Sequence, residues 1–192
     1  SRIDDSKAKL IVTASCGYEP GRTVYYKPLV NKAIELAKHK PNKCIIFQRE
    51  KDKAELNPSM DISWVDSIKD VESVECEKMN ANDYAYILYT SGTTGLPKGI
   101  VRDIGGHIVA LKWTMKNIYN IEQNDVWWSA SDIGWIVGHS YIVYAPLFYG
   151  CTTVLFEGKP VGTPDAGVFW RVISEHKVKS LFTAPTAIRA IK

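Results

Sequence analysis

The stretch Y-I-L-Y-T-S-G-T-T-G-L-P-K-G, residues 86–99, passes from an apolar run into a cluster of hydroxyls and glycines that ends at a lysine. Glycine tolerates positive φ, so neighbouring backbone N–H groups can turn to one side and form a concave nest for an anion. The hydroxyls add hydrogen-bond donors, and the lysine adds a positive charge. The stretch therefore predicts a polyphosphate site. Its residues are Thr90, Ser91, Gly92, Thr93, Thr94, Gly95 and Lys98.

The spacing of this loop excludes two common nucleotide-binding motifs. A Walker loop requires G-x-x-x-x-G-K-[ST], whereas this chain has G-x-x-G-x-x-K-G, and Gly99 stands where the Mg²⁺-binding hydroxyl would be. The loop also lacks the G-x-G-x-x-G of a dinucleotide fold. A Gly/Thr-rich surface turn is the alternative interpretation of a loose match.

The elements that must position this loop alternate between strand and helix patterns, which predicts an α/β fold with largely parallel sheets flanked by helices. A chain that leaves a parallel strand at its carboxyl end is a common ligand site, so we expect the loop to follow such a strand. Strands are expected at residues 9–14, 43–48, 83–90, 99–102, 125–131, 151–157 and 178–184, and helices at 28–40, 61–71, 105–119, 135–150, 164–177 and in the opening turns after residue 183. Residues 13–28 and 49–60 are expected as loops, and the polar region 49–82 as a surface region or boundary.

Composition and charge restrict the class of protein. Hydrophobic residues make up 45% of the 192 residues and charged residues 23%, which is typical of a globular protein. The net charge of +3 is spread along the chain without basic runs, so we expect no nucleic-acid partner. The apolar runs are too short and interrupted for a membrane span. The four cysteines stand far apart, which argues against a zinc site and for a reducing compartment. We expect an intracellular protein with no metal-ligand cluster.

The eleven-residue run Y-T-S-G-T-T-G-L-P-K-G, residues 89–99, resembles the phosphate-binding signature of the adenylate-forming superfamily. That superfamily includes acyl-CoA synthetases, peptide-synthetase adenylation domains and luciferases. The resemblance implies that the loop holds the β and γ phosphates of ATP, with Mg²⁺, while a carboxylate attacks the α phosphate. It implies positioning and charge stabilisation by residues 90–98, with Lys98 as a supporting charge and no catalytic residue in this chain.

Residues 131–160 are similar to the short-chain acyl-CoA synthetases, and closer to their propionate-activating than to their acetate-activating members. The resemblance implies an acyl pocket walled by Trp135, Ile136 and Val137, with Val137 also at the coenzyme A site. Gly134 and Gly138 would permit the close approach of a ligand or of another part of the backbone. His139 is either a hydrogen-bonded core histidine or, as the resemblance implies, a supporting residue of the substrate site.

The stretch T-A-S-C-G-Y-E-P-G-R-T-V-Y-Y-K-P, residues 13–28, corresponds in the short-chain synthetases to a turn that holds the phosphate-bearing end of coenzyme A. The resemblance implies contacts from Glu19, Pro20, Gly21 and Arg22. A guanidinium suits a phosphate, whereas the carboxylate of Glu19 would repel one, so Glu19 is expected to contribute through its backbone. Arg22 as an ordinary exposed arginine is the alternative.

The resemblance covers the whole chain and implies part of the large N-terminal domain of an AMP-forming ligase, without the C-terminal domain. It implies ATP, Mg²⁺ and coenzyme A as cosubstrates and propionate in preference to acetate. The chain alone is expected to be inactive, and the compartment to be the cytoplasm, or the mitochondrial matrix in a eukaryote. A carrier-protein-loading adenylation domain and a non-catalytic nucleotide-binding module are the alternatives.

Overall fold

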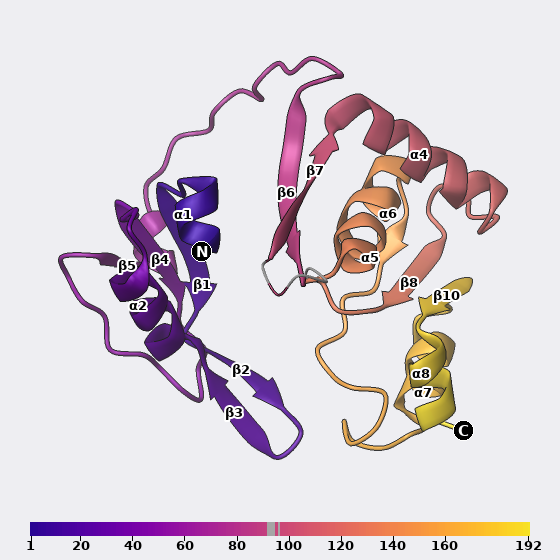
Figure 1. Ribbon diagram of the computed structural model, residues 1–192. Coiled ribbons are helices and arrows are strands. Elements are labelled where there is room, and N and C mark those ends of the chain that lie inside the picture. Colours follow the sequence, from indigo (N-terminus) through magenta and orange to yellow (C-terminus); the bar gives the residue numbers. More distant parts are fainter. Residues whose placement is uncertain (92–94, 96) are drawn as a thin grey trace. The chain divides into compact units, whose positions relative to one another are not determined.

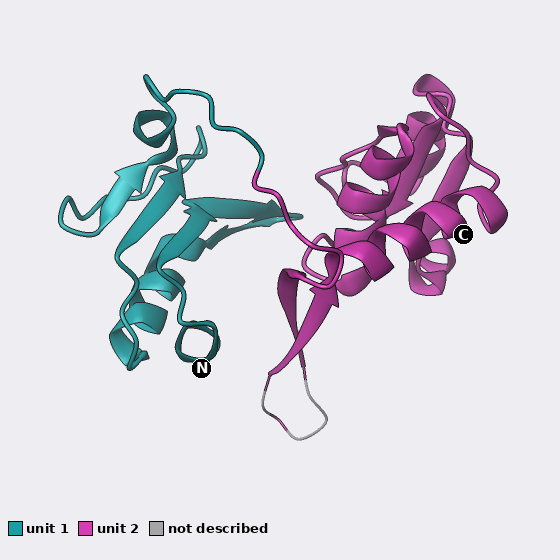
Figure 2. Cartoon of the chain, turned by 90° about the horizontal axis from the view of Figure 1, so that it is seen from above, with its two compact units in different colours: residues 1–76 teal, residues 77–192 magenta. Residues whose placement is uncertain are grey.

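The computed structural model describes residues 1–91, 95 and 97–192 of the chain. They form two compact units, residues 1–76 and 77–192, and the boundary between them in the sequence falls within the polar region 49–82 (Figure 2). Each unit has a three-stranded parallel sheet, helices and one antiparallel hairpin. The prediction of an α/β fold with parallel sheets flanked by helices is confirmed.

Unit 1 is organised around the parallel sheet β1-β4-β5 (Figure 1). Its elements are α1 (Arg2–Ser6), β1 (Leu10–Ala14), β2 (Cys16–Glu19), β3 (Arg22–Tyr25), α2 (Tyr26–Leu36), β4 (Lys43–Phe47), β5 (Asp61–Ser63) and α3 (Trp64–Ser67). Cys44 and Ile46 of β4 are fully buried, as expected for the central strand of a parallel sheet. The ammonium of Lys27 on α2 forms an ion pair of 2.8 Å with the carboxylate of Asp61 on β5, and both side chains are buried. This pair fixes the start of α2 against the edge strand.

Unit 2 begins with the hairpin β6–β7 and continues into the parallel sheet β10-β8-β9. Its elements are β6 (Tyr84–Thr90), β7 (Lys98–Asp103), α4 (Ile104–Asn117), β8 (Val126–Ala130), α5 (Ile136–Gly138), the π-helix η1 (His139–Tyr144), α6 (Ala145–Tyr149), β9 (Thr152–Thr153), α7 (Val168–Glu175), β10 (Ser180–Thr183) and α8 (Pro185–Ala190). The side chain of Asp103 accepts a hydrogen bond of 2.6 Å from the backbone N–H of Gly106. Because this N-cap satisfies a free amide, β7 passes into α4 without a connecting loop.

The central strand β8 is covered on both faces by helices. Trp127 packs in one apolar cluster with Leu111 and Met115 of α4, and Trp128 packs in a second cluster with Phe169 of α7 and Ala187 of α8. Neighbouring strand residues point to opposite faces, so two adjacent tryptophans can fill two separate cores. This double burial explains the continuous apolar run of the strand.

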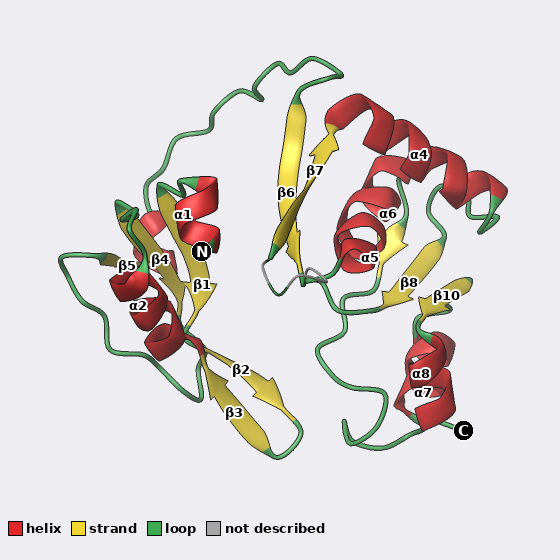
Figure 3. Ribbon diagram, viewed as in Figure 1, coloured by secondary structure: helices red, strands yellow, loops and turns green. Residues whose placement is uncertain are grey.

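Most predicted elements are present with their ends shifted by a few residues (Figure 3). The confirmed strands are those expected at 9–14, 43–48, 83–90, 99–102, 125–131 and 178–184, and the confirmed helices are those expected at 28–40, 105–119 and 164–177 and after residue 183. Two further predictions are confirmed only in part. Residues 61–71 form the strand β5 followed by the four-residue α3, because Asp61 to Ser63 pair with β4. The strand expected at 151–157 is reduced to β9, which pairs only with the first two residues of β8.

The helix expected at 135–150 is divided into α5, η1 and α6. Pro146 lacks an N–H group, so the carbonyl of Ile142 has no α-helical partner and instead accepts a hydrogen bond of 3.0 Å from the Thr153 hydroxyl. The carbonyl of Tyr141 accepts one of 2.7 Å from the indole of Trp127. The break is thus stabilised by side chains of β8 and β9. The helix ends at Gly150, with φ of 81°, as predicted.

Within the described residues, 1–91, 95 and 97–192, no helix is long and apolar enough to cross a membrane.

Candidate functional site

The two ends of the hydroxyl-glycine loop are held side by side by the hairpin β6–β7. Thr90 and Lys98 are register partners in this antiparallel pair, so their side chains share one face of the hairpin. The adjoining Ser91 is exposed, and Gly95 has a φ of 82°, which glycine adopts without strain. Hydroxyl donors and an ammonium group therefore lie together at the end of the hairpin. The other three candidates from the sequence, Gly92, Thr93 and Thr94, lie outside the described residues.

This hairpin corrects the predicted setting of the loop. We expected the loop to follow a strand of a parallel sheet, but β6 pairs with β7 and with no strand of the parallel sheets. Gly99 packs against β6 so closely that a Cβ there would lie 2.9 Å from the Ile87 side chain. The loop is therefore presented by an antiparallel arm rather than by the edge of a parallel sheet.

The acyl segment, residues 135–139, begins with exposed side chains, and the chain becomes more buried as it continues into η1. The side chains of Trp135 and Val137 are 56% and 37% exposed, and Ile136 is half-buried. The start of the helix expected at 135–150 is therefore not buried. A Cβ at Gly138 would lie 2.5 Å from the Cα of Ile133 and even closer to the carbonyl oxygen of residue 132. The glycine is thus required by a close backbone contact, and the exposed apolar side chains remain available to a ligand.

His139 lies against the strand that leads to the loop. Its Nδ1 is 2.5 Å from the carbonyl oxygen of Ile133, which can only accept, so Nδ1 carries the proton. Nε2 is the second hydrogen-bonding nitrogen of the ring. Its ring centroid is 5.4 Å from that of Tyr86 on β6. The structure thereby brings together the acyl segment and the phosphate-loop hairpin, which the sequence predicted as separate motifs.

Tyr86 in turn contacts two further aromatic residues, and the sequence did not indicate this cluster. Tyr86 also stacks on Tyr144, with the rings 5.4 Å apart and nearly parallel, and its hydroxyl is 3.3 Å from Nε2 of His107 on α4. Burial lowers the pKa of His107, and the positive charge of Arg102 adds to this effect. His107 is therefore neutral near pH 7. The tyrosines looked like ordinary strand and helix residues, and only the contacts between elements identify the cluster.

The predicted coenzyme A loop in unit 1 is the β-hairpin β2–β3, not an irregular loop. Pro20 and Gly21 form its tip, and Gly21 has a φ of 76°, as a Pro-Gly turn requires. Glu19 and Arg22 are register partners, and one Glu19 oxygen accepts hydrogen bonds of 2.9 and 2.6 Å from Nε and Nη2 of Arg22. The Arg22 side chain is 69% exposed. The guanidinium is thus accessible, but it is already paired with a carboxylate.

Asp52, which lies in the loop after β4, holds this hairpin through hydrogen bonds. Its carboxylate accepts hydrogen bonds of 3.3 Å from Thr23 and 3.4 Å from the Tyr25 hydroxyl, while its carbonyl accepts one of 2.7 Å from Ser15. The loop 49–60 was predicted as a plain surface loop, so this role was missed.

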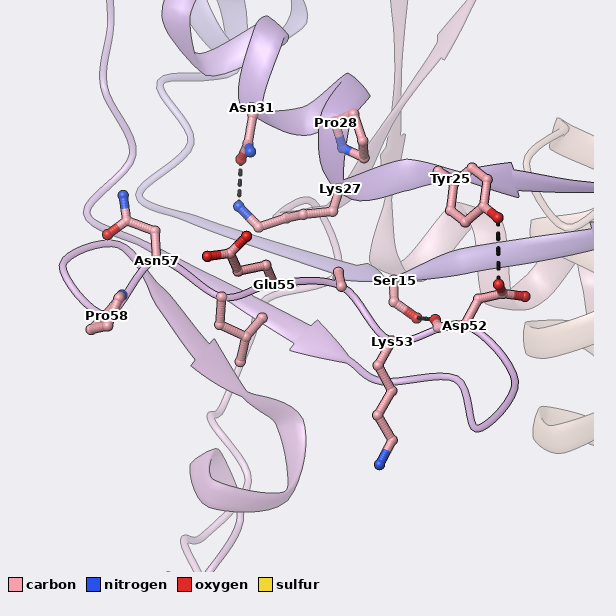
Figure 4. Close-up of a pocket in the computed structure, with 12 residues that line it drawn as sticks. Ser15, Tyr25, Lys27, Pro28, Asn31, Asp52, Lys53, Glu55, Asn57 and Pro58 are labelled. Carbon is pink, nitrogen blue, oxygen red and sulfur yellow. Dashed lines mark hydrogen bonds between the residues drawn. The ribbon is translucent and has the colours of Figure 1, made fainter.

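A pocket of about 550 Å³ opens beside Asp52 at the base of the hairpin (Figure 4). Lys27 lies on its wall and donates a hydrogen bond to Asn31 in addition to its ion pair with Asp61. Glu55 and Lys53 also line the pocket, so its lining carries charges of both signs. The pocket was not anticipated from the sequence, because its residues come from the junction of β1 and β2, from β3 and α2, and from the loop after β4. In the described parts of the chain, no group of three or more His, Cys, Asp or Glu side chains could hold a metal ion.

The fold and the phosphate-type loop agree with the comparison against known families. Residues 1–192 match the family model described as AMP-binding enzyme, and the chain belongs to that family. It is 55% identical over 193 residues to acyl-CoA synthetase short-chain family member 3, mitochondrial, of Homo sapiens, covering 100% of this chain and 28% of the human protein. It is 42% identical over 203 residues to propionate–CoA ligase of Salmonella typhimurium, covering 100% of this chain and 31% of that protein.

A solved structure shows the same fold. Acetoacetyl-CoA synthetase from Streptomyces lividans matches with a TM-score of 0.81 at 22% identity, over 98% of this chain and 29% of the other. The chain therefore spans less than a third of each of these three proteins. The resemblance to short-chain acyl-CoA synthetases is confirmed.

Proposed function

We propose that the full-length protein is an AMP-forming short-chain acyl-CoA synthetase that prefers propionate to acetate. In the first half-reaction a carboxylate oxygen attacks the α phosphorus of ATP, giving acyl-adenylate and pyrophosphate. In the second, the thiol sulfur of coenzyme A attacks the acyl carbon, which releases AMP and a proton and leaves the thioester. The observation that carries the proposal is the pairing of Thr90 with Lys98 at the hairpin end, in a chain of the AMP-binding enzyme family.

The groups at the hairpin end suit a polyphosphate. Hydroxyls at Thr90 and Ser91 can donate to phosphate oxygens, and the ammonium of Lys98 can neutralise charge that builds up on the leaving pyrophosphate. These groups bind and orient ATP, and none of them forms a covalent bond. Mg²⁺ would accompany ATP and neutralise phosphate charge. We assign Gly92, Thr93, Thr94 and Gly95 to the same phosphate site on the basis of the sequence motif.

The exposed apolar side chains of the acyl segment suit a short acyl group. Trp135, Ile136 and Val137 would form one wall of the acyl pocket, and His139 would support the bound substrate through Nε2. One methylene discriminates by about 1–3 kcal/mol, so propionate is favoured over acetate without excluding it. The printed names of the human and Salmonella relatives support a short-chain acid and, for the latter, propionate.

The hairpin β2–β3 supports coenzyme A as the acceptor. Arg22 offers an exposed guanidinium for a phosphate, and the tip at Pro20 and Gly21 offers backbone groups in an open position. We also assign Val137 and the backbone of Glu19 to this substrate. Given the name of the human relative, we place the protein in the mitochondrial matrix if the source is a eukaryote, and otherwise in the cytoplasm.

The test uses the full-length protein with ATP and Mg²⁺. We expect pyrophosphate exchange that depends on a carboxylate, and kcat/KM in the order propionate, acetate, butyrate. Transfer to coenzyme A but not to a carrier-protein thiol separates a synthetase from a carrier-loading domain. Absence of exchange with all three acids would contradict the proposal and favour a non-catalytic nucleotide-binding protein. Residues 1–192 alone are expected to give no exchange, because they span about 28% of the human relative.

A further inference from the structure

The cluster around Tyr86, defined as Tyr86, His107, His139 and Tyr144, joins three elements of unit 2. Tyr86 comes from β6, His107 from α4, and His139 and Tyr144 from the two ends of η1. Tyr86 is the centre of the cluster: its ring is 5.4 Å from that of His139, 5.4 Å from that of Tyr144 and 5.6 Å from that of His107, and the rings of His107 and Tyr144 are 5.9 Å apart. Such distances are in the range in which aromatic pairs attract each other.

The π-helix is what allows two of its residues to touch the same ring. Residues five apart in an α-helix point about 140° away from each other, since each residue turns the helix by about 100°. In a π-helix the hydrogen bonds run from i to i+5, so residues five apart lie nearly one above the other. His139 and Tyr144 are five apart, and both contact Tyr86. A regular α-helix over residues 139–144 would separate them.

The hydroxyl of Tyr86 fixes the position of the outer end of its ring. Stacking on Tyr144 sets the plane of the ring, but it leaves the ring free to slide within that plane. The contact of 3.3 Å with Nε2 of His107 ties the outer end of the ring to α4. His107 is neutral near pH 7 because burial lowers its pKa, so its Nε2 can accept the hydroxyl hydrogen.

We propose that Tyr86 is a positioning residue for adenylate formation, holding the phosphate-loop hairpin in register with the acyl segment by stacking on η1 and hydrogen bonding to His107. This inference rests on the proposed function. Tyr86 lies four residues before Thr90 on β6, and His139 lies two residues after Val137. The contact between Tyr86 and His139 therefore connects the phosphate-binding residues to the acyl-binding residues through short stretches of regular backbone. A small error in that register would misalign the carboxylate and the α phosphate.

The test compares the two half-reactions of the full-length enzyme. Tyr86→Phe keeps the stacked ring and removes the hydroxyl. We expect kcat for propionate-dependent pyrophosphate exchange to fall about five- to tenfold, as for one lost hydrogen bond. Thioester formation from supplied propionyl-adenylate and coenzyme A should be unchanged. A residue that only stabilises the fold would lower both half-reactions together, and that outcome would overturn the proposal.

Four more variants sharpen the comparison, one of them the double variant Tyr86→Phe with His107→Leu. His107→Leu should reproduce Tyr86→Phe, the double variant should be no worse than either single one, and His107→Gln should restore most of the exchange because its amide can still accept. Tyr84→Phe is the matched control, because Tyr84 is on the same strand and is 75% exposed. Additive losses in the double variant, or an equal loss in the control, would contradict the proposal.

Failure of the proposed function is recognised separately. If the wild-type protein shows no exchange with any acid, the synthetase proposal is wrong, and calorimetric Kd values for ATP then decide the role of Tyr86. Weaker binding in Tyr86→Phe than in both wild type and Tyr84→Phe would support positioning of the phosphate loop. Equal Kd values in the three proteins would overturn it.

Discussion

At the residue scale, pairs of side chains decide which groups are available to substrates. Arg22 was predicted from the family resemblance and from the chemistry of a guanidinium, but its guanidinium is held by Glu19 across the hairpin turn. The two residues are three apart in the sequence, and in the hairpin they lie opposite each other on neighbouring strands. Such an exposed ion pair is worth about 0–1 kcal/mol, so a phosphate can displace the carboxylate at modest cost.

Glu19→Gln is expected to lower KM for coenzyme A about two- to fivefold in the full-length enzyme, because Arg22 loses a competing carboxylate. Pyrophosphate exchange should not change, since coenzyme A takes no part in it. Glu35→Gln, which breaks another exposed ion pair, that of Lys32 and Glu35 on α2, is the control. An unchanged or higher KM for coenzyme A in Glu19→Gln would show that Arg22 does not meet the phosphate.

Lys98→Ala is expected to lower kcat/KM for ATP about ten- to a hundredfold, the effect of one charge-assisted hydrogen bond, without abolishing activity. Lys98→Arg should keep part of the rate. The control is Lys112→Ala, an exposed lysine on α4. Complete loss of adenylate formation would make Lys98 a catalytic residue, contrary to the supporting role assigned here, and unchanged kinetics would remove it from the phosphate site.

At the element scale, local patterns predicted which segments are helix or strand but not how they are interrupted. The regular helix α4 was evident from its apolar spacing. The break between α5, η1 and α6 depends on Trp127 and Thr153, which are remote in sequence, so no local pattern could indicate it. Pro146 was the one local signal, since it removes the hydrogen bond that a continuous helix would need.

Gly138→Ala is expected to lower the free energy of unfolding by roughly 1–3 kcal/mol, because the new methyl group would overlap the backbone of residues 132 and 133. Urea unfolding followed by circular dichroism measures this. Gly134→Ala is the matched control, since its Cβ would meet only the side-chain end of Asp132, at 3.1 Å. Equal losses in the two variants would mean that the close approach at residue 138 does not limit the packing of the acyl segment.

At the scale of the whole molecule, the division into two units follows from where apolar residues can be buried. Residues 71–80 are exposed throughout and form neither helix nor strand, whereas the parts before and after them each have a buried core. The polar composition of region 49–82 indicated a surface region. It did not distinguish residues 49–60, which are held by hydrogen bonds such as those between Gln48 and Ala54, from the exposed stretch.

Limited proteolysis of the 192-residue chain with a glutamate-specific protease should therefore cut first at Glu72, Glu75 or Glu77. The backbone there is accessible, which is what a protease needs. Glu50 and Glu55 are internal controls, because they lie in the hydrogen-bonded loop beside Asp52. Mass spectrometry identifies the first products. Earlier cleavage at Glu50 or Glu55 would contradict the division.

The distribution of tryptophans gives the protein a set of optical reporters. Trp127 and Trp128 are fully shielded from water in two different cores, while Trp135 is among the exposed ones and stands in the acyl segment. Buried indoles fluoresce at shorter wavelengths than indoles exposed to water. A short carboxylic acid that binds against Trp135 should therefore shift the tryptophan fluorescence of the unlabelled protein to the blue. Trp135→Phe should abolish that shift, while the fluorescence of Trp127 and Trp128 persists.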